Sequence, residues 1–133
     1  MIDMVAVKRV LRQLTAGFAV AAVVIVAVLA GVRLGDPQSP DLADGAVLAV
    51  AVVGLVGLVI AALWYSHAGE RPASPAQVQS GFIIRIAVAE LGLLLGVMAI
   101  FLTGALLPAL IGLGLFLISL LLLYLGLKQI PDA

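Results

Sequence analysis

Residues 82–103 read FIIRIAVAELGLLLGVMAIFLT, and this stretch decides how the chain folds. A helix of about 22 residues rises about 33 Å, which is enough to cross a hydrocarbon core of about 30 Å. Arg85 lies near one end of the stretch, and Glu90 lies well inside it. The sequence therefore predicts a transmembrane helix that carries an acidic side chain far from water.

The composition indicates that lipid surrounds most of the chain. Of the 133 residues, 65% are hydrophobic and 11% are charged, and the mean hydropathy is +1.33. A soluble domain has about 25% charged residues, so this chain lacks the polar surface that contact with water requires. The formal net charge of zero argues against a nucleic-acid partner, which needs a basic face.

Catalytic and metal-binding patterns are missing from the sequence. There is no cysteine, which excludes thiolate chemistry and cysteine metal sites, and His67 is the single histidine, which cannot hold a metal alone. Ser66 and Ser74 have no candidate base or orienting acid beside them, so no catalytic triad can be built. We therefore expect no enzyme, no cofactor and no metal site.

Four apolar runs predict an all-α polytopic membrane protein in which residues 1–133 form one membrane domain, a four-transmembrane-helix bundle. The expected spans are residues 14–32, 42–65, 80–103 and 108–127. Ser39-Pro40 predicts a helix N-cap followed by proline in the first turn. Ser74-Pro75-Ala76-Gln77 predicts a capping box, so the third helix should begin near Pro75. Pro108 should start the fourth helix.

The distribution of charges predicts the orientation of the bundle. Residues 1–13 are expected to form an amphipathic lead-in at the membrane surface. Basic side chains precede the first span, flank the second loop and follow the last span: Lys8, Arg9, Arg12, Arg71, Arg85 and Lys128. The first loop instead contains one base against three acids: Arg33, Asp36, Asp41 and Asp44. By the positive-inside rule, both termini and the second loop face the cytoplasm and the first loop lies outside, in a multi-pass protein of the cell membrane.

A faint internal repeat raises the alternative of two similar hairpins. Gln13–Phe18 and Gln77–Phe82 share Gln, Gly and Phe in register, at the starts of the first and third spans. Parallel repeats of this kind occur in transporters. We favour a chance match, because sequences drawn from few apolar residue types produce such matches often.

Glu90 is the candidate functional residue, because an ionisable side chain within the membrane is costly and marks a functional site by default. Arg85, a possible partner, lies five residues away on the same helix and is turned off the face of Glu90. A partner should therefore come from another helix. Counting helical rise from the membrane surface places Ser119 of the fourth span, and the backbone near Gly57 of the second, at the depth of Glu90.

Two interpretations of a buried Glu90 stay open. In the first, the carboxyl group handles a proton or docks onto a polar partner. In the second, a hydrogen bond between Glu90 and Ser119 holds the helices together, and such bonds are worth about 0.6–2 kcal/mol.

A stripe of mostly small residues follows one face of the third span at spacings of three and four: Arg85, Ala89, Gly92, Gly96, Ala99 and Thr103. Small residues let helix backbones approach closely, and Gly92 with Gly96 forms a small-xxx-small pair. Gly54, Gly57 and Ala61 on the second span form the expected partner groove. We expect this stripe to pack the bundle rather than to form a dimer seam.

Part of the chain resembles the ATP synthase protein I family, small four-span accessory proteins of bacterial ATP synthases. The similarity covers residues 64–110, where Trp64-Tyr65-Ser66-His67, a loop, Ala89-Glu90 and the Leu107-Pro108 turn follow one another in similar order and spacing. Where the family carries a lysine three residues after the acid, this chain has Leu93. The resemblance implies a helper in assembly or ion supply, with the acid carried over as the intramembrane carboxyl.

Three functions stay open at this point. We expect a small non-enzymatic integral membrane protein that is an accessory, assembly or small subunit of a larger complex, with the lipid bilayer and other membrane subunits or copies of itself as partners. The first alternative is a proton- or cation-translocating proteolipid or small transporter that uses Glu90, since the proteolipids of rotary ATPases also place one Glu mid-helix. The second is a purely structural membrane or envelope protein.

Overall fold

A computed structural model describes residues 3–32, 40–67, 74–103 and 106–130. These residues form four helices and no strand: α1 (Met4–Val32), α2 (Pro40–His67), α3 (Pro75–Thr103) and α4 (Leu107–Gln129). All four are long and apolar enough to cross a membrane. The predicted all-α bundle of four transmembrane helices is therefore confirmed. Residues 33–39 and 68–73 of the two polar loops, from which the orientation was predicted, lie outside the described residues.

The helix starts follow the local signals in the sequence. At the start of α3, the backbone N–H of Ser74 donates to Oε1 of Gln77 at 3.1 Å, and the backbone N–H of Gln77 donates to Oγ of Ser74 at 3.2 Å. This reciprocal pair is the predicted capping box, with Pro75 as the first helical residue. α2 begins at Pro40, and α4 has proline in its first turn. Ser39, the predicted N-cap of α2, lies outside the described residues.

Residues 4–13, the greater part of the predicted amphipathic lead-in, form the first turns of the continuous helix α1. Oδ1 of Asp3 accepts a hydrogen bond from the backbone N–H of Ala6 at 2.7 Å and caps the helix. The apolar face of this segment, which includes Val7 and Leu11, is buried in the core of the bundle. The apolar side of this amphipathic segment therefore packs against the other helices.

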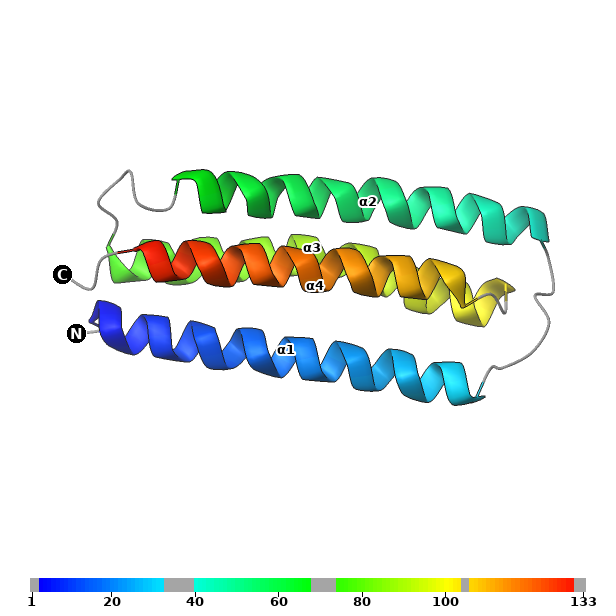
Figure 1. The fold of residues 1–133 in the computed structure, drawn as a ribbon, viewed down its shortest axis with the longest axis horizontal. Coiled ribbons are helices and arrows are strands. Elements are labelled where there is room, and N and C mark those ends of the chain that lie inside the picture. Colours follow the sequence, from blue (N-terminus) through cyan, green and yellow to red (C-terminus); the bar gives the residue numbers. More distant parts are fainter. Residues whose placement is uncertain (1–2, 33–39, 68–73, 104–105, 131–133) are drawn as a thin grey trace.

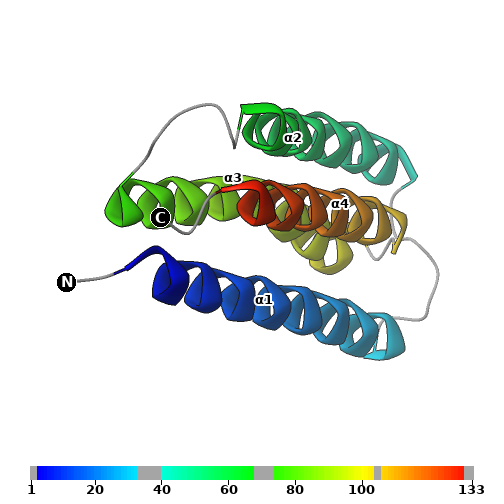
Figure 2. The same cartoon turned by 60° about the vertical axis from the view of Figure 1, so that its left-hand side comes forward.

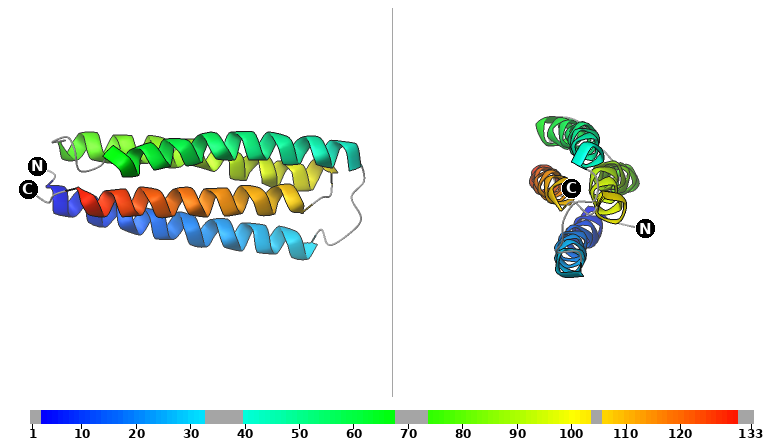
Figure 3. Two further views of the ribbon diagram at one scale, coloured as in Figure 1. Left: turned by 45° about the horizontal axis from the view of Figure 1, so that its top comes forward. Right: turned by 90° about the vertical axis from the view of Figure 1, so that its right-hand side faces the viewer.

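The helices lie side by side and antiparallel in chain order (Figure 1). α1 and α3 begin, and α2 and α4 end, at one end of the bundle, which we call the proximal end. Viewed along the helices, α3 and α4 lie between α1 and α2 (Figure 3), and α1 and α2 flank this central pair on opposite sides (Figure 2). Within the described residues, α1 contacts α3 and α4 but not α2. α1 and α2 therefore do not form a packed hairpin as α3 and α4 do, which fits the chance interpretation of the internal repeat.

Glycines bring the backbones of α2, α3 and α4 into direct contact. A methyl group added at Gly92 of α3 would lie 3.0 Å from Cα of Gly54 on α2. A methyl group at Gly112 of α4 would lie 2.7 Å from the carbonyl oxygen of Gly92. Real Cβ atoms essentially never approach another atom closer than 3.0 Å, and a contact at 3.0 Å is itself tighter than most real ones. The three helices therefore meet at Gly92.

Two further contacts continue this packing along α3. A methyl group at Gly57 of α2 would lie 2.9 Å from Cα of Ala89, and one at Gly96 would lie 2.8 Å from Cα of Ala109 on α4. In α1, by contrast, a methyl group at Gly17 would meet no described atom within 4 Å. The structure thus consists of a close-packed α2–α3–α4 core and a more loosely attached α1.

We expect Gly96→Leu to destabilise the bundle and Gly17→Leu to be tolerated. The leucine at position 96 must push α3 away from Ala109, and overpacking of this kind costs about 1–3 kcal/mol. Thermal unfolding of both variants in the same mild detergent measures the difference. Equal melting temperatures for the two variants would contradict the described packing of α3 on α4.

Candidate functional site

Glu90 lies near the middle of the 29-residue helix α3, at the edge of its buried face. Ile86 and Leu93, one turn before and after it, are buried, whereas Ile83 and Leu94 are 43% and 47% exposed. Glu90 itself is half-buried. The prediction of a buried Glu90 is therefore corrected, because the count of helical rise gives the depth of a residue but not its rotation about the helix axis.

The structure does not bring the three predicted partners to Glu90. Oγ of Ser119 donates to the backbone carbonyl of Leu115 at 2.8 Å, and Gly57 packs against Ala89. Arg85 contacts a different side chain, as described below. Among the described residues, the Glu90 carboxyl group forms no hydrogen bond or ion pair.

The buried hydroxyl groups of the bundle bond within their own helices. The same back-bond to the carbonyl four residues earlier occurs at Thr15, whose Oγ1 donates to Leu11 at 2.8 Å, and at Thr103, whose Oγ1 donates to Ala99 at 2.7 Å. A hydroxyl group in a transmembrane helix satisfies its donor locally in this way and needs no acid from another helix. Ser119 follows this rule, which explains why equal depth did not make it a partner of Glu90.

A second polar cluster, at the proximal end, was not predicted. The indole ring of Trp64 on α2 lies between α3 and α4, and its Nε1 donates to the backbone carbonyl of Leu123 at 3.1 Å. The ring meets Phe82 edge-on, with centroids 5.8 Å apart and an angle of 71°. Cζ of Arg85 lies 4.7 Å from the centroid of the same indole ring, close enough for a cation–π interaction. We call these residues the Trp64 cluster.

The backbone around the Trp64 cluster completes its contacts. A methyl group at Gly126 would lie 2.6 Å from Cδ1 of Trp64, so only glycine leaves room for the indole ring on α4. Nη1 of Arg85 donates to the backbone carbonyl of Gly81 at 2.9 Å, while Nε of Arg85 is buried without a hydrogen bond to any described group. Arg85 therefore covers Trp64 from α3 instead of pairing with Glu90.

The residues of the Trp64 cluster can be recognised in the sequence only when the ends of different helices are compared, because no pattern within one helix contains them all. Trp64 ends the second span and Phe82 and Arg85 start the third, so a short loop brings all three to the same end of the bundle. Gly126 is the only glycine near the end of the fourth span. A large ring and a glycine at the same depth in the membrane predict a contact between their helices. This prediction requires knowledge of which helices are neighbours.

Comparison of the chain with protein-family models, with curated proteins and with solved structures finds no match. The functional assignment therefore depends on the chemistry of the residues themselves. Among the described residues, no group of three or more His, Cys, Asp or Glu side chains could hold a metal ion.

We expect Trp64→Ala to lower the thermal stability of the bundle, because it removes the ring contacts and the hydrogen bond to Leu123. Full burial would make this loss about 3–5 kcal/mol, and half-buried Trp64 should give less. Tyr65→Ala, at an exposed neighbouring position, is the matched control. Thermal unfolding followed by circular dichroism compares the two. A Tyr65→Ala protein as unstable as Trp64→Ala would contradict the role given to the indole ring.

Proposed function

We propose that this chain is a non-enzymatic integral membrane protein that acts as an accessory or small subunit of a larger membrane complex, with Glu90 as its docking group. The observation that carries the proposal is a half-buried carboxyl group at mid-helix that has no partner within the described chain. Such a group costs about 2.5–3.5 kcal/mol or more in hydrocarbon. A polar group on another membrane helix that hydrogen-bonds with the side chain would offset this cost.

The surroundings of Glu90 support docking more than internal packing. A residue that only holds the bundle together needs a partner on a neighbouring helix of the same chain, and Ser119 and Gly57 have other contacts. Next to Glu90, Leu91 and Leu94 expose apolar side chains. Glu90 with these two leucines offers a second transmembrane helix an apolar surface with one acid, a combination that gives both packing and register.

The resemblance to the ATP synthase protein I family supports the same role. In that comparison, Glu90 takes the place of the family's intramembrane acid, and the implied activity is assistance to assembly or ion supply rather than catalysis. Residence in the cell membrane, with both termini in the cytoplasm, belongs to this proposal and is supported by the basic residues near the proximal end.

We expect Glu90→Leu to abolish a stoichiometric partnership that wild type and Glu90→Gln retain. Gln keeps the hydrogen-bonding shape of the side chain, whereas Leu removes all polarity. Quantitative co-purification from the native membrane in mild detergent measures partner recovery, and Leu91→Ala, in the same proposed surface, measures the contribution of the apolar contact. If Glu90→Leu recovers the same partner in the same amount, Glu90 is not the docking group.

The same unpartnered acid favours a second candidate, a proton- or cation-translocating role. Purified protein in liposomes would then carry an ion flux that Glu90→Gln abolishes while the protein still folds. Docking tolerates Glu90→Gln and translocation does not, so this variant separates the two functions. A protein with neither a partner nor a flux would be a structural membrane or envelope protein.

We expect the two polar loops to lie on opposite sides of the membrane, as the positive-inside rule requires. The chain has no cysteine, so single-cysteine variants can be labelled without background. A cysteine within residues 35–43 should react with an impermeant maleimide on intact cells. One within residues 68–76 should react only after permeabilisation. Labelling of both loops from the same side would contradict the topology.

A further inference from the structure

The proximal end of the bundle has an open basic pocket between α1 and α4. The pocket has a volume of about 300 Å³, and four of its lining residues are basic: Lys8, Arg9 and Arg12 of α1 and Lys128 of α4. The chain contains only seven Lys and Arg residues in total. No acidic residue of the described chain lines the pocket. More than half of the basic side chains are therefore gathered around one opening.

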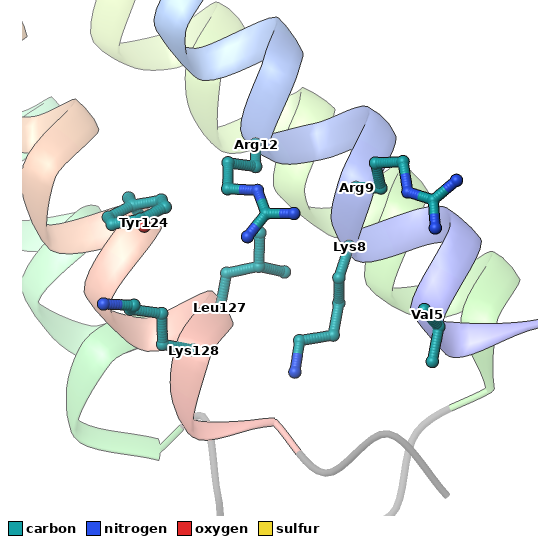
Figure 4. A pocket seen from close by; sticks show the side chains of 7 residues that line it. All are labelled: Val5, Lys8, Arg9, Arg12, Tyr124, Leu127 and Lys128. Atoms are coloured by element: carbon teal, nitrogen blue, oxygen red, sulfur yellow. The ribbon is translucent and has the colours of Figure 1, made fainter.

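In Figure 4, the guanidinium group of Arg9 points away from α4 and the amine of Lys128 points toward Tyr124, whereas Lys8 and Arg12 lie nearer the space between the two helices. Arg12 and Lys8 extend from α1 into that space, and Nζ of Lys8 donates to the backbone carbonyl of Ile130 at 2.7 Å. Nζ of Lys128 lies 5.2 Å from the centroid of the Tyr124 ring, which holds it on the α4 side. Within the described residues, Arg9 and Arg12 form no ion pair or side-chain hydrogen bond. The N–H groups of the Arg12 guanidinium can therefore donate hydrogen bonds to an external anion.

The pocket combines basic side chains with apolar ones. Such a lining suits a lipid, which has a charged headgroup and apolar acyl chains, better than it suits a soluble ion. Val5 and Leu127 contribute apolar walls, and Tyr124 is typical of the membrane–water interface. Helical spacing continues the same face of α1 through Ala16 and Val23, both exposed. On α4, the face of Tyr124 and Lys128 continues through Leu121, which is also exposed. A path for acyl chains thus leads from the cations into the hydrocarbon region.

We propose that this α1–α4 basic pocket binds the phosphate headgroup of an anionic phospholipid. Arg12 and Lys128 contact the phosphate from the two helices, Arg9 adds positive charge at the rim, and the acyl chains lie along the apolar faces of α1 and α4. Basic pockets between transmembrane helices bind anionic headgroups by this chemistry. The bound lipid would fill the space beside α1, the helix with the weakest packing, and so join α1 to the core. This inference does not depend on the role of Glu90.

The test measures lipid binding to the full-length protein in detergent by native mass spectrometry, with phosphatidylglycerol and phosphatidylcholine of the same acyl chains as probes. We expect selective retention of phosphatidylglycerol, and a loss of about fivefold in affinity for each of Arg12→Gln and Lys128→Gln. Phosphatidylglycerol should also raise the melting temperature of wild type more than phosphatidylcholine does. Equal retention of the two lipids would overturn the proposal.

A charge-matched variant separates a built site from a general attraction. Arg12→Gln combined with Gln13→Arg keeps the net charge but moves the cation about 100° around α1, off the pocket. This double variant should bind phosphatidylglycerol as weakly as Arg12→Gln. If it binds as wild type does, charge near the membrane surface is sufficient and the pocket is not the site. Displacement of the lipid by an equal concentration of inorganic phosphate would also overturn the proposal, because the ligand would then be a soluble anion.

Discussion

The direct contact of three helix backbones at Gly92 is the constraint on which the rest of the bundle depends. In lipid, apolar side chains gain little by leaving one apolar surrounding for another, so helices associate through short-range packing. Dispersion attraction needs distances near van der Waals contact. Gly54, Gly92 and Gly112 provide those distances where α2, α3 and α4 meet. At that point the glycines are required by close approach and not by backbone conformation.

This contact also determines the direction of Glu90. Each residue of an α-helix turns the chain by about 100°, so Glu90, two positions before Gly92, is rotated about 160° from it. When Gly92 faces α2 and α4, Glu90 cannot point into that core. It lies instead at the edge of the buried face, beside Ile86 and Leu93. The packing that stabilises the chain thus leaves its one mid-helix acid half-buried, without a hydrogen-bond partner among the described residues.

The fold could be predicted from the sequence because each signal for it is local. A run of apolar residues long enough to span lipid needs no knowledge of its neighbours, and the capping box at Ser74 and Gln77 lies within four residues. The surroundings of Glu90 and Arg85 could not be predicted in this way, since they depend on the rotation of α3. The small-residue stripe and an inward Glu90 were inferred separately, although the rotation of about 160° between Gly92 and Glu90 prevents both from facing α2 and α4.

The peripheral position of α1 bears on the order in which the bundle is assembled during synthesis. α1 and α2 enter the membrane first, yet they have no contact with each other in the described structure. Each can pack against α3 once α3 has entered, whereas the contacts of both with α4 form last. Trp64 of α2 remains without its hydrogen-bond acceptor until Leu123, close to the end of α4, has emerged. The first two helices therefore have no packing partner within the described structure until α3 enters, and the packing is completed only with α4.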